Sequence, residues 1–521
     1  MPISNRRFSS TISSCGLIDA NIEALYVVLN HSYQPDSSRE RSALCNVTAN
    51  VNALKSWETY QNLSRYKRSV KELDRFLAMA GRSSGCRLRL KNLVYPDLTP
   101  VKSTDLRHAF EHPEKSPFYA YFEELADRAA AASPEIIGIS LMFLSQALSA
   151  FSLIGCLRRR TITSKILLGG GLLTSWMNDS NRQPPFQDMV DACLPHRGDQ
   201  ALLDYLGVKQ TVACGLPDYS DFNKDLYLSP ARLFPYSTSL GCYWNKCRFC
   251  PEAAEKKSFQ PLSSEQLTAD LQNLREKERT GVIHFLDNAI PPKHLNRIID
   301  NPPKAWWYGY VRFEPALESK DYCQALYESG CRMLQLGLES GDQQVLNEMR
   351  KGTRLSAVRR ILDNLHQSGI AAYVYVLFGT PYETAETARH TFEFIQRMSE
   401  RIDWMNPSIF NLPLLSSEIN DYETNLFYPG DLSLYADFRH PHGWGRREVR
   451  RFVQNEFLQD PVIKSIYQRT PPSFTSEPCC LFPACPKPAR LIFIRPARFR
   501  VRNPAQTGSS ILFLQQIPAC V

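Results

Sequence analysis

The sequence lacks an uninterrupted apolar stretch typical of a membrane span. The nearest candidate, residues 136–156, is long enough to cross a bilayer, but four serines and a glutamine interrupt it. It divides better into a buried strand, "IIGISLMF", and a helix over 145–160 that ends in three arginines. No long apolar run follows the N-terminal "MPISNRRFSSTISS", so no secretory signal is evident. We therefore expect no membrane span and a cytoplasmic location.

Acidic residues are missing from the C-terminal end of the chain. No Asp or Glu follows Glu477, and six of the eight net positive charges lie beyond it. The rest of the chain is close to neutral, which argues against a nucleic-acid-binding surface. The segment 478–521 is also rich in Pro, Cys and Arg, and we expect it to be a disordered extension.

Cysteines are plentiful but mostly scattered singly, and their total of fifteen is odd. This pattern favours reduced thiols in a cytoplasm over a disulfide framework. A chain of 521 residues is long enough for about two to three domains.

Strand and helix patterns alternate along two parts of the chain. After a mixed, largely helical region over 1–105, the first series covers 106–206 and predicts an α/β fold with a doubly wound parallel sheet. Three glycines, Gly169, Gly170 and Gly171, end its second strand, at the edge where such sheets bind ligands. A tight turn is the alternative explanation for them. The GxGxxG fingerprint is absent, so no dinucleotide site is predicted.

The second series follows a linker over 207–234 and covers 235–420. It predicts six strands joined by helical crossovers, which fit an incomplete (β/α)6 barrel of the TIM type. Catalytic groups of such barrels gather at the carboxyl ends of the strands. We expect a helical extension over 421–477 to follow the barrel.

Three cysteines stand close together in "GCYWNKCRFC", residues 241–250: Cys242, Cys247 and Cys250. Three thiolates can hold three irons of a 4Fe–4S cluster and leave the fourth iron open. Zinc would need a fourth ligand, for which His284, Cys479, Cys480 and Cys485 are candidates. The triplet alone leaves both metals open. Its position after the first strand of the expected barrel favours an active site over structural zinc.

The region 235–420 resembles the radical S-adenosylmethionine (radical SAM) superfamily. After the cysteine triplet, whose first gap is one residue longer than the usual CxxxCxxC, four further motifs occur in the expected order: "FLDNAIPP", "LGLESG", "MRKGT" and "VLFGTPYET". Five matches in register make the resemblance specific, while the longer gap leaves the subfamily open.

This resemblance implies a role for individual residues. Cys242, Cys247 and Cys250 would ligate the cluster, Phe249 would lie against the adenine of S-adenosylmethionine, and Asp287 would meet its amino group. Glu339 and Ser340 would lie near the ribose and methionine, and Gly379 and Pro381 near the adenine. From the residues alone, Asp287 could simply be a turn acid at the end of its strand, and Glu339 could pair with Arg312. No residue acting on the substrate is predicted.

The first series is similar to the cobalamin-binding domain often fused ahead of such barrels. The resemblance implies that Ser140, Gly169, Gly170 and Gly171 line a corrin ring. The cobalt-ligating DxHxxG pattern is absent, so no ligand residue supports binding.

The sequence thus predicts a radical SAM enzyme with a 4Fe–4S cluster and S-adenosylmethionine as cofactors, and with cobalamin as a third if the N-terminal domain binds it. Its substrate would be a small molecule or a peptide, and its electron donor a flavodoxin or ferredoxin. One alternative is a cobalamin-dependent radical SAM methyltransferase. An alternative of another class is a non-catalytic iron–sulfur or zinc protein that transfers electrons or binds partners.

Overall fold

The computed structural model describes residues 14–161, 163–178, 185–209, 216–277, 281–473 and 510–515. The chain forms two compact units. Unit 1 comprises 1–230, 430–432 and 484–521, and unit 2 comprises 231–429 and 433–483. The division at 230–231 lies close to the predicted start of the barrel at 235.

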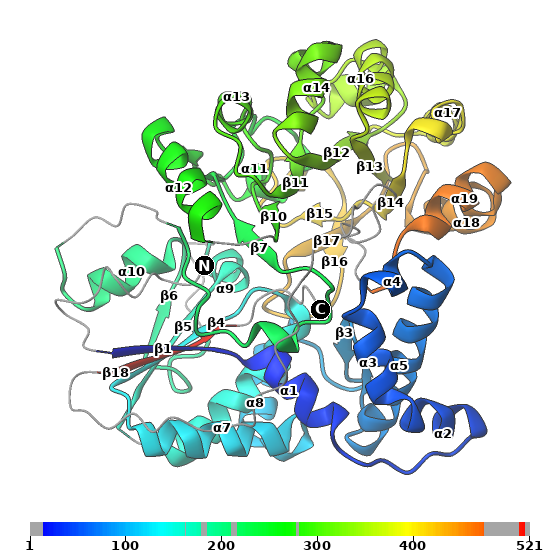
Figure 1. Cartoon of the computed structure of the whole chain (residues 1–521). Helices are drawn as coiled ribbons and strands as arrows, with labels where there is room; N and C mark the ends of the chain where they lie inside the picture. The colour runs from blue at the N-terminus through cyan, green and yellow to red at the C-terminus, as the bar shows by residue number, and fades with distance from the viewer. Residues whose placement is uncertain are drawn as a thin grey trace. The chain divides into compact units, whose positions relative to one another are not determined.

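Unit 1 is built on a five-stranded parallel sheet (Figure 1). Its strands, in spatial order, are β1 (Ser14–Asp19), β18 (Ser510–Gln515), β4 (Ile136–Ser140), β5 (Lys165–Gly169) and β6 (Ala192–Leu194). Ile136, Ile137 and Ile139 of β4 are all buried, as the continuous apolar run predicted for a strand covered on both faces.

The helices of unit 1 fall into those beside the sheet and those of the N-terminal region. The first set is α1 (Ala20–Leu29), α6 (Ser103–Glu111), α7 (Tyr119–Ala132), α8 (Leu144–Arg160), α9 (Gly171–Met177) and α10 (Gly198–Tyr205). The second is α2 (Ser38–Cys45), α3 (Val47–Leu54), α4 (Trp57–Tyr60) and α5 (Leu63–Ser83), followed by the hairpin of β2 (Arg87–Arg89) and β3 (Asn92–Val94).

Helix α8 contains most of the apolar segment that was weighed as a membrane span. Arg158 and Arg160 in its last turn form ion pairs with Asp191 and Asp127. None of the helices in the described ranges is long and apolar enough to cross a bilayer.

The C-terminal segment supplies a strand that the sequence did not predict. β18 lies between β1 and β4, with Ser510 paired to Ser14 and Ile511 to Ile136. The prediction of a disordered extension over 478–521 is therefore wrong for Ser510–Gln515. The predicted domain limits of 106–206 also miss β1 and β18. Residues 474–509 and 516–521 lie outside the described residues.

Unit 2 contains a six-stranded sheet in which every pair is parallel. The strands follow chain order: β7 (Leu233–Tyr236), β10 (Val282–Phe285), β11 (Trp306–Val311), β12 (Cys331–Glu339), β13 (Ala371–Phe378) and β14 (Trp404–Ile409). The predicted α/β fold with parallel strands is confirmed.

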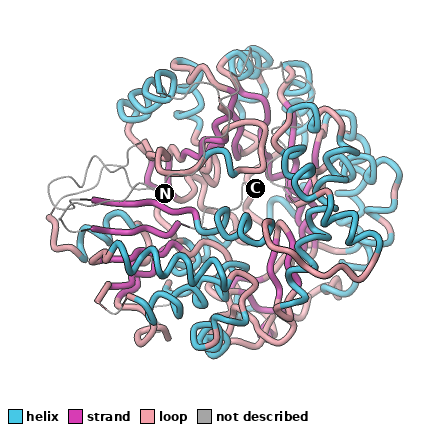
Figure 2. Tube along the Cα trace, turned by 60° about the horizontal axis from the view of Figure 1, so that its bottom comes forward, coloured by secondary structure: helices cyan, strands magenta, loops and turns pink. Residues whose placement is uncertain are grey.

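Helices connect these strands and lie along the outer side of the sheet (Figures 1 and 2). They are α12 (Ser264–Lys277), α13 (Pro292–Asp300), α14 (Lys320–Glu328), α15 (Gln343–Glu348), α16 (Leu355–Ser368) and α17 (Ala385–Arg397). Side-chain caps fix several starts: Ser263 accepts a hydrogen bond from the Gln266 amide at 3.1 Å, and Thr384 accepts one from the Thr387 amide at 3.2 Å.

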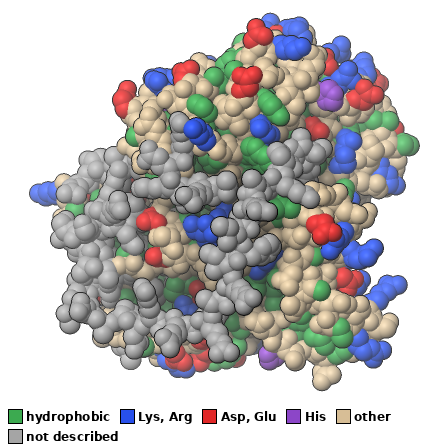
Figure 3. All heavy atoms as spheres, in the orientation of Figure 1, with side chains coloured by type: hydrophobic (Ala, Val, Ile, Leu, Met, Phe, Trp, Pro, Cys, Tyr) green, Lys and Arg blue, Asp and Glu red, His purple; other side chains and the backbone are tan. Residues whose placement is uncertain are grey.

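The region after β14 forms a small antiparallel sheet before its helices. The sheet comprises β15 (Leu412–Pro413), β17 (Tyr435–Phe438) and β16 (Thr424–Leu426), and α18 (Arg446–Asn455) and α19 (Pro461–Arg469) follow. The expectation of a purely helical extension over 421–477 is therefore wrong for its first part. On the face drawn in Figure 3, basic and acidic side chains are intermixed.

Candidate functional site

The three cysteines lie in one loop, called here the cysteine loop (241–259). It begins after β8 (Ser239–Leu240), which pairs with β9 (Gln260–Pro261) and so closes the loop at its base. A four-residue helix, α11 (Pro251–Ala254), starts directly after Cys250. The loop therefore follows β7, at the carboxyl end of the first strand of the sheet, as predicted.

The cysteine thiols influence one another and are surrounded by charge. Cys247 is buried, whereas Cys242 and Cys250 are half-buried. Burial raises the pKa of Cys247, an effect opposed by the cations Lys351 and Arg312 and increased by the charge of Cys242. Burial also raises the pKa of Cys250 to about 11. The three thiols thus share one electrostatic neighbourhood.

The three thiols and their surroundings fit a 4Fe–4S cluster in which the protein ligates three of the four irons. The donor set consists of three sulfur atoms from one loop, with two cations nearby and the backbone amides of Glu252 and Ala253 directed at Cys250. Within the described ranges, no three His, Cys, Asp or Glu side chains are already arranged to hold a metal ion. Of the candidate zinc ligands, His284 stacks on Tyr308 at 4.3 Å. Cys479, Cys480 and Cys485 lie outside the described residues.

The additional residue of the cysteine loop is accommodated by Trp244 and Asn245. Asn245 adopts φ +43°, the left-handed region that asparagine tolerates better than most residues. The Trp244 indole N–H donates to the Arg350 carbonyl at 3.0 Å, and the Arg312 guanidinium lies 4.2 Å from the ring centre. A Cβ on Gly352 would lie 2.2 Å from the Trp244 ring, so this contact requires glycine. The longer loop is thus docked on residues 350–352.

Glu339 faces Lys351 rather than Arg312. The two form a nearly buried ion pair at 2.8 Å, and the Lys351 ammonium lies 5.5 Å from the centre of the Phe249 ring. The alternative pairing with Arg312 is wrong, because Arg312 pairs with Glu314. Glu339 has φ +65° at an irregularity in the pairing of β12 with β13, and this strained backbone turns its side chain toward the cysteine loop.

Asp287 is occupied by the segment that leads into the cysteine loop. Its carboxylate accepts hydrogen bonds from the Thr238 amide at 2.9 Å, the Thr238 hydroxyl at 2.7 Å and the Ser239 hydroxyl at 2.5 Å. Burial raises its pKa, and these bonds oppose that shift. Asp287 is therefore more than an exposed turn acid: it fixes the strand β8 from which the cysteine loop departs.

Ser340 lies beside the start of α15. Its hydroxyl is buried, contacts the Thr391 hydroxyl at 3.2 Å and accepts from the Asp342 amide at 3.1 Å. These contacts join the end of β12 to α17.

Gly379 and Pro381 form the turn after β13, and Glu383 holds that turn. The buried Glu383 accepts from the Gly379 amide at 2.5 Å and from the Trp444 indole at 2.9 Å. Its Oε1 has no hydrogen-bond partner among the described residues. Burial raises the pKa of Glu383 to about 8.

In unit 1, Ser140 and the three glycines end two neighbouring strands, β4 and β5. Gly170 has φ +103°, and a Cβ there would lie 2.3 Å from the Leu141 carbonyl oxygen, so the turn requires glycine. Next to it, Met142 and Phe143 are 37% and 44% exposed. The turn explanation therefore holds for Gly170, and an exposed apolar pair lies at the carboxyl edge of the sheet.

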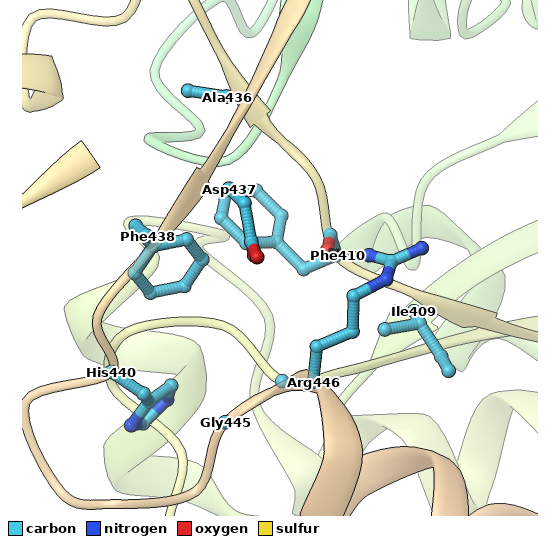
Figure 4. A pocket seen from close by; sticks show the side chains of 9 residues that line it. Ile409, Phe410, Ala436, Asp437, Phe438, His440, Gly445 and Arg446 are labelled. Atoms are coloured by element: carbon cyan, nitrogen blue, oxygen red, sulfur yellow. Dashed lines mark hydrogen bonds between the residues drawn. The ribbon is translucent and has the colours of Figure 1, made fainter. Parts of the chain in front are cut away.

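A small hollow, partly open to solvent, lies at the carboxyl ends of β13 and β14 (Figure 4). Gly379 and Ile409 line it from the ends of β13 and β14, Phe438 comes from β17, and Arg446 is the first residue of α18.

Sequence reasoning missed Trp244, Lys351, Glu383 and Arg446. Trp244, Lys351 and Glu383 lie inside the motifs given above, so the motifs pointed to these positions although no role was predicted for their side chains. Arg446 belongs to no motif, and only the fold brings it to the hollow.

Unit 2 therefore defines an α/β enzyme domain with a cysteine-lined site at the carboxyl edge of a parallel sheet. Residues 236–395 match the family described as the radical SAM superfamily. The match runs from the end of β7 into α17 and includes the cysteine loop. The chain thus carries a radical SAM domain, the domain of enzymes that use a 4Fe–4S cluster and S-adenosylmethionine, and the resemblance drawn from the motifs is confirmed.

Similar proteins were found by sequence and by structure. The chain is 26% identical over 199 residues to bacteriochlorophyllide d C-12(1)-methyltransferase of Chlorobaculum tepidum, which covers 36% of this chain and 42% of that protein. Among solved structures, the radical S-adenosylmethionine methyltransferase TsrM of Kitasatospora setae aligns with a TM-score of 0.48 and 15% identity, over 62% of this chain and 78% of that one. The cobalamin-dependent S-adenosylmethionine radical enzyme OxsB aligns with a TM-score of 0.45 and 19% identity, over 53% and 46%.

Proposed function

We propose that this protein cleaves S-adenosylmethionine reductively at a 4Fe–4S cluster held by Cys242, Cys247 and Cys250. The observation that carries the proposal is the presence of the three thiols in one loop of the radical SAM domain, with the charges of Lys351 and Arg312 acting on Cys247. In this proposal the six-stranded sheet of unit 2 is an incomplete (β/α)6 barrel, and the sheet of unit 1 is doubly wound. Residues 235–420 form the barrel domain.

One electron supplied through the reduced cluster would cleave the sulfonium to methionine and a 5′-deoxyadenosyl radical, which attacks a C–H bond of the substrate. Residues of this chain would bind and orient S-adenosylmethionine. Phe249 would lie against the adenine, and the turn of Gly379 and Pro381 would lie near it. The ion pair of Glu339 and Lys351 would lie near the ribose and methionine.

Asp287 and Ser340 act mainly as positioning residues in this proposal. The three hydrogen bonds accepted by Asp287 come from the protein itself, so it holds β8 and the cysteine loop in place. Its contact with the methionine amino group, implied by the family, stays a prediction. Ser340 fixes the end of β12 next to Glu339.

A second candidate is cobalamin-dependent methyl transfer. It is favoured by the methyltransferase name of the relative and by the edge of the unit 1 sheet, where Ser140 and Gly169–Gly171 lie beside the exposed Met142 and Phe143. An apolar edge of this kind suits the face of a large ring. The chain spans about two fifths of that relative, so its substrate is not carried over. Corrinoid extraction and S-adenosylhomocysteine formation would distinguish this candidate.

The reaction needs an external reductant, for which we propose a flavodoxin or a ferredoxin in the cytoplasm. The substrate would be a small molecule or a peptide.

The test is the metal content of the protein purified and reconstituted without oxygen. Wild type should carry four irons per chain, and Cys242→Ala, Cys247→Ala and Cys250→Ala should each lose them. Cys45→Ser, at an exposed cysteine outside the loop, is the matched control and should keep the full iron content. Stoichiometric zinc in place of iron would favour the non-catalytic alternative and overturn the proposal.

A further inference from the structure

His294, in the first turn of α13, reaches the base of the cysteine loop. Its ring is buried, and each nitrogen has a partner: Nδ1 lies 2.8 Å from the Thr238 hydroxyl, and Nε2 lies 3.2 Å from the Leu262 carbonyl oxygen. The Thr238 hydroxyl in turn lies 2.7 Å from Asp287 Oδ1. Thr238 directly precedes β8 and Leu262 directly follows β9, so His294 contacts both ends of the strand pair that closes the loop. We call this chain of three hydrogen bonds, from Leu262 through His294 and Thr238 to Asp287, the relay.

The relay needs one proton more than a neutral histidine and an ionised carboxylate provide. A carbonyl oxygen only accepts, so the contact with Leu262 requires a hydrogen on Nε2 of His294. The Thr238 hydroxyl has one hydrogen, yet it lies between His294 Nδ1 and Asp287, which would then both only accept. One of these two contacts lacks a hydrogen unless His294 Nδ1 or the Asp287 carboxyl carries a further proton.

Two arrangements complete the relay, and both hold the extra proton. In the first, cationic His294 donates to Thr238, and Thr238 donates to ionised Asp287. In the second, protonated Asp287 donates to Thr238, and Thr238 donates to neutral His294. The three side chains are at most 2% exposed, so water does not replace a missing hydrogen bond, and leaving a buried polar group unpaired is unfavourable.

The groups around the relay make Asp287 the partner of His294. Burial raises the pKa of Asp287 and lowers the pKa of His294, and the charge of Asp287 opposes the second shift. The charge of Lys293 acts against protonation of His294. On α12, which packs against α13, the buried Asp270 accepts a hydrogen bond from the Tyr236 hydroxyl at 2.8 Å. Asp287 is thus the carboxyl group joined to His294 by hydrogen bonds.

We propose that His294 and Asp287 share one retained proton through Thr238, and that this proton holds β8, and with it the cysteine loop, in place. His294 is therefore a positioning residue, which acts on the loop through Thr238 and Asp287. The inference rests on the proposed function, because it concerns the loop that would hold the cluster.

The shared proton gives the loop a dependence on pH with a definite sign. In the unfolded chain the pair releases this proton near the ordinary pKa of histidine, about 6.5. The folded pair retains it to higher pH, because its loss breaks a buried hydrogen bond, and the proton belongs to the pair rather than to either residue. The stabilisation is therefore present at low pH and is lost as the pH rises.

Asp287→Asn distinguishes a shared proton from a purely structural carboxylate. Its amide oxygen can accept from the Thr238 backbone amide, and its NH2 group can donate to the Thr238 and Ser239 hydroxyls. The Thr238 hydroxyl can then donate to neutral His294, so this variant completes the relay without a titrating proton. Thr238→Val interrupts the relay, and His366→Gln, at an exposed histidine of α16, is the matched control.

The test is the rate at which the full-length reconstituted protein loses iron to a chelator, without S-adenosylmethionine, at a series of pH values from about pH 6 to pH 9. Wild type and His366→Gln should lose iron as slowly as Asp287→Asn at the acidic end. At the alkaline end they should lose it about 10-fold faster than Asp287→Asn, because one buried hydrogen bond is missing. Thr238→Val should lose iron rapidly at every pH.

The comparison of wild type with Asp287→Asn decides the inference. A ratio of the two rates that stays constant with pH overturns it. Rapid iron loss from Asp287→Asn at the acidic end also overturns it, because Asp287 would then act as an ionised, purely structural carboxylate.

Urea unfolding over the same pH series needs no iron and separates this inference from the proposed function. Wild type should lose stability relative to Asp287→Asn as the pH rises, and Glu383, which both proteins contain, cancels in the comparison. A protein that holds no iron but shows this divergence would count against the proposed function alone.

Discussion

Glu383 gives unit 2 a stability that should fall as the pH rises. Its carboxyl is fully buried, and burial raises its pKa from 4.5 to about 8. In the unfolded chain the same carboxyl ionises near pH 4.5. Between these values the unfolded state has released a proton that the folded state still holds, so unfolding becomes more favourable with increasing pH. The stabilisation is complete below pH 4.5 and is lost as the pH rises to about 8.

The magnitude follows from the shift. One pKa unit corresponds to about 1.4 kcal/mol, so this one group should lower the free energy of unfolding by about 1.4 kcal/mol per pH unit across that window. Glu383→Gln removes the titration and keeps an oxygen that can accept from the Gly379 amide and the Trp444 indole. Relative to this variant, wild type should lose about 2 to 3 kcal/mol between pH 6 and pH 8.

The assay is denaturant unfolding of both proteins at a series of pH values, with tryptophan emission as the probe. Glu386→Gln, an exposed change two residues into α17, is the control and should track wild type at every pH. The reasoning is refuted if the difference between wild type and Glu383→Gln stays constant from pH 6 to pH 8, because that result would mean that Glu383 is already ionised in the fold.

Three further predictions concern other contacts. Gly352→Ala should push the Trp244 ring away and lower the free energy of unfolding by about 1–3 kcal/mol. The loosened loop should also lose iron faster to a chelator. Unchanged tryptophan emission and an unchanged rate of iron loss would contradict the docking of the loop. Lys351→Met should lower the free energy of unfolding, measured by chemical denaturation, by about 3 kcal/mol, because it leaves Glu339 nearly buried and unpaired. Adding Glu339→Gln should recover part of this loss. A Lys351→Met protein as stable as wild type would argue against the ion pair. Deletion of 510–521 removes the strand between β1 and β4 and should lower the Tm of unit 1 and expose β1 to proteolysis, whereas an unaltered calorimetric trace would show that β18 is dispensable.

Local patterns carried most of the fold prediction. The buried run at 136–140 and the alternation of strands with helices over 235–420 are local, so each could be identified from its own residues. β18 could not, because it follows no strand–helix rhythm and its partners Ser14–Asp19 and Ile136–Ser140 are hundreds of residues away.

The candidate site, too, could be predicted from the sequence only in part. The spacing of the cysteines indicated the loop, but the partners that hold it come from elsewhere in the fold. Lys351 reaches Glu339 because the backbone turns back at Arg350 with φ +53°. Glu383 looks like an ordinary turn acid in the sequence, and its burial depends on Trp444, which packs over it from the region after β17.

The most direct test of the central claim is the product formed from S-adenosylmethionine by the anaerobically reconstituted, chemically reduced protein. The account predicts 5′-deoxyadenosine and methionine in equal amounts from wild type and from Cys45→Ser, and neither from Cys247→Ala. A protein that carries its full complement of iron yet forms no 5′-deoxyadenosine under reducing conditions, with or without added corrinoid, would contradict it.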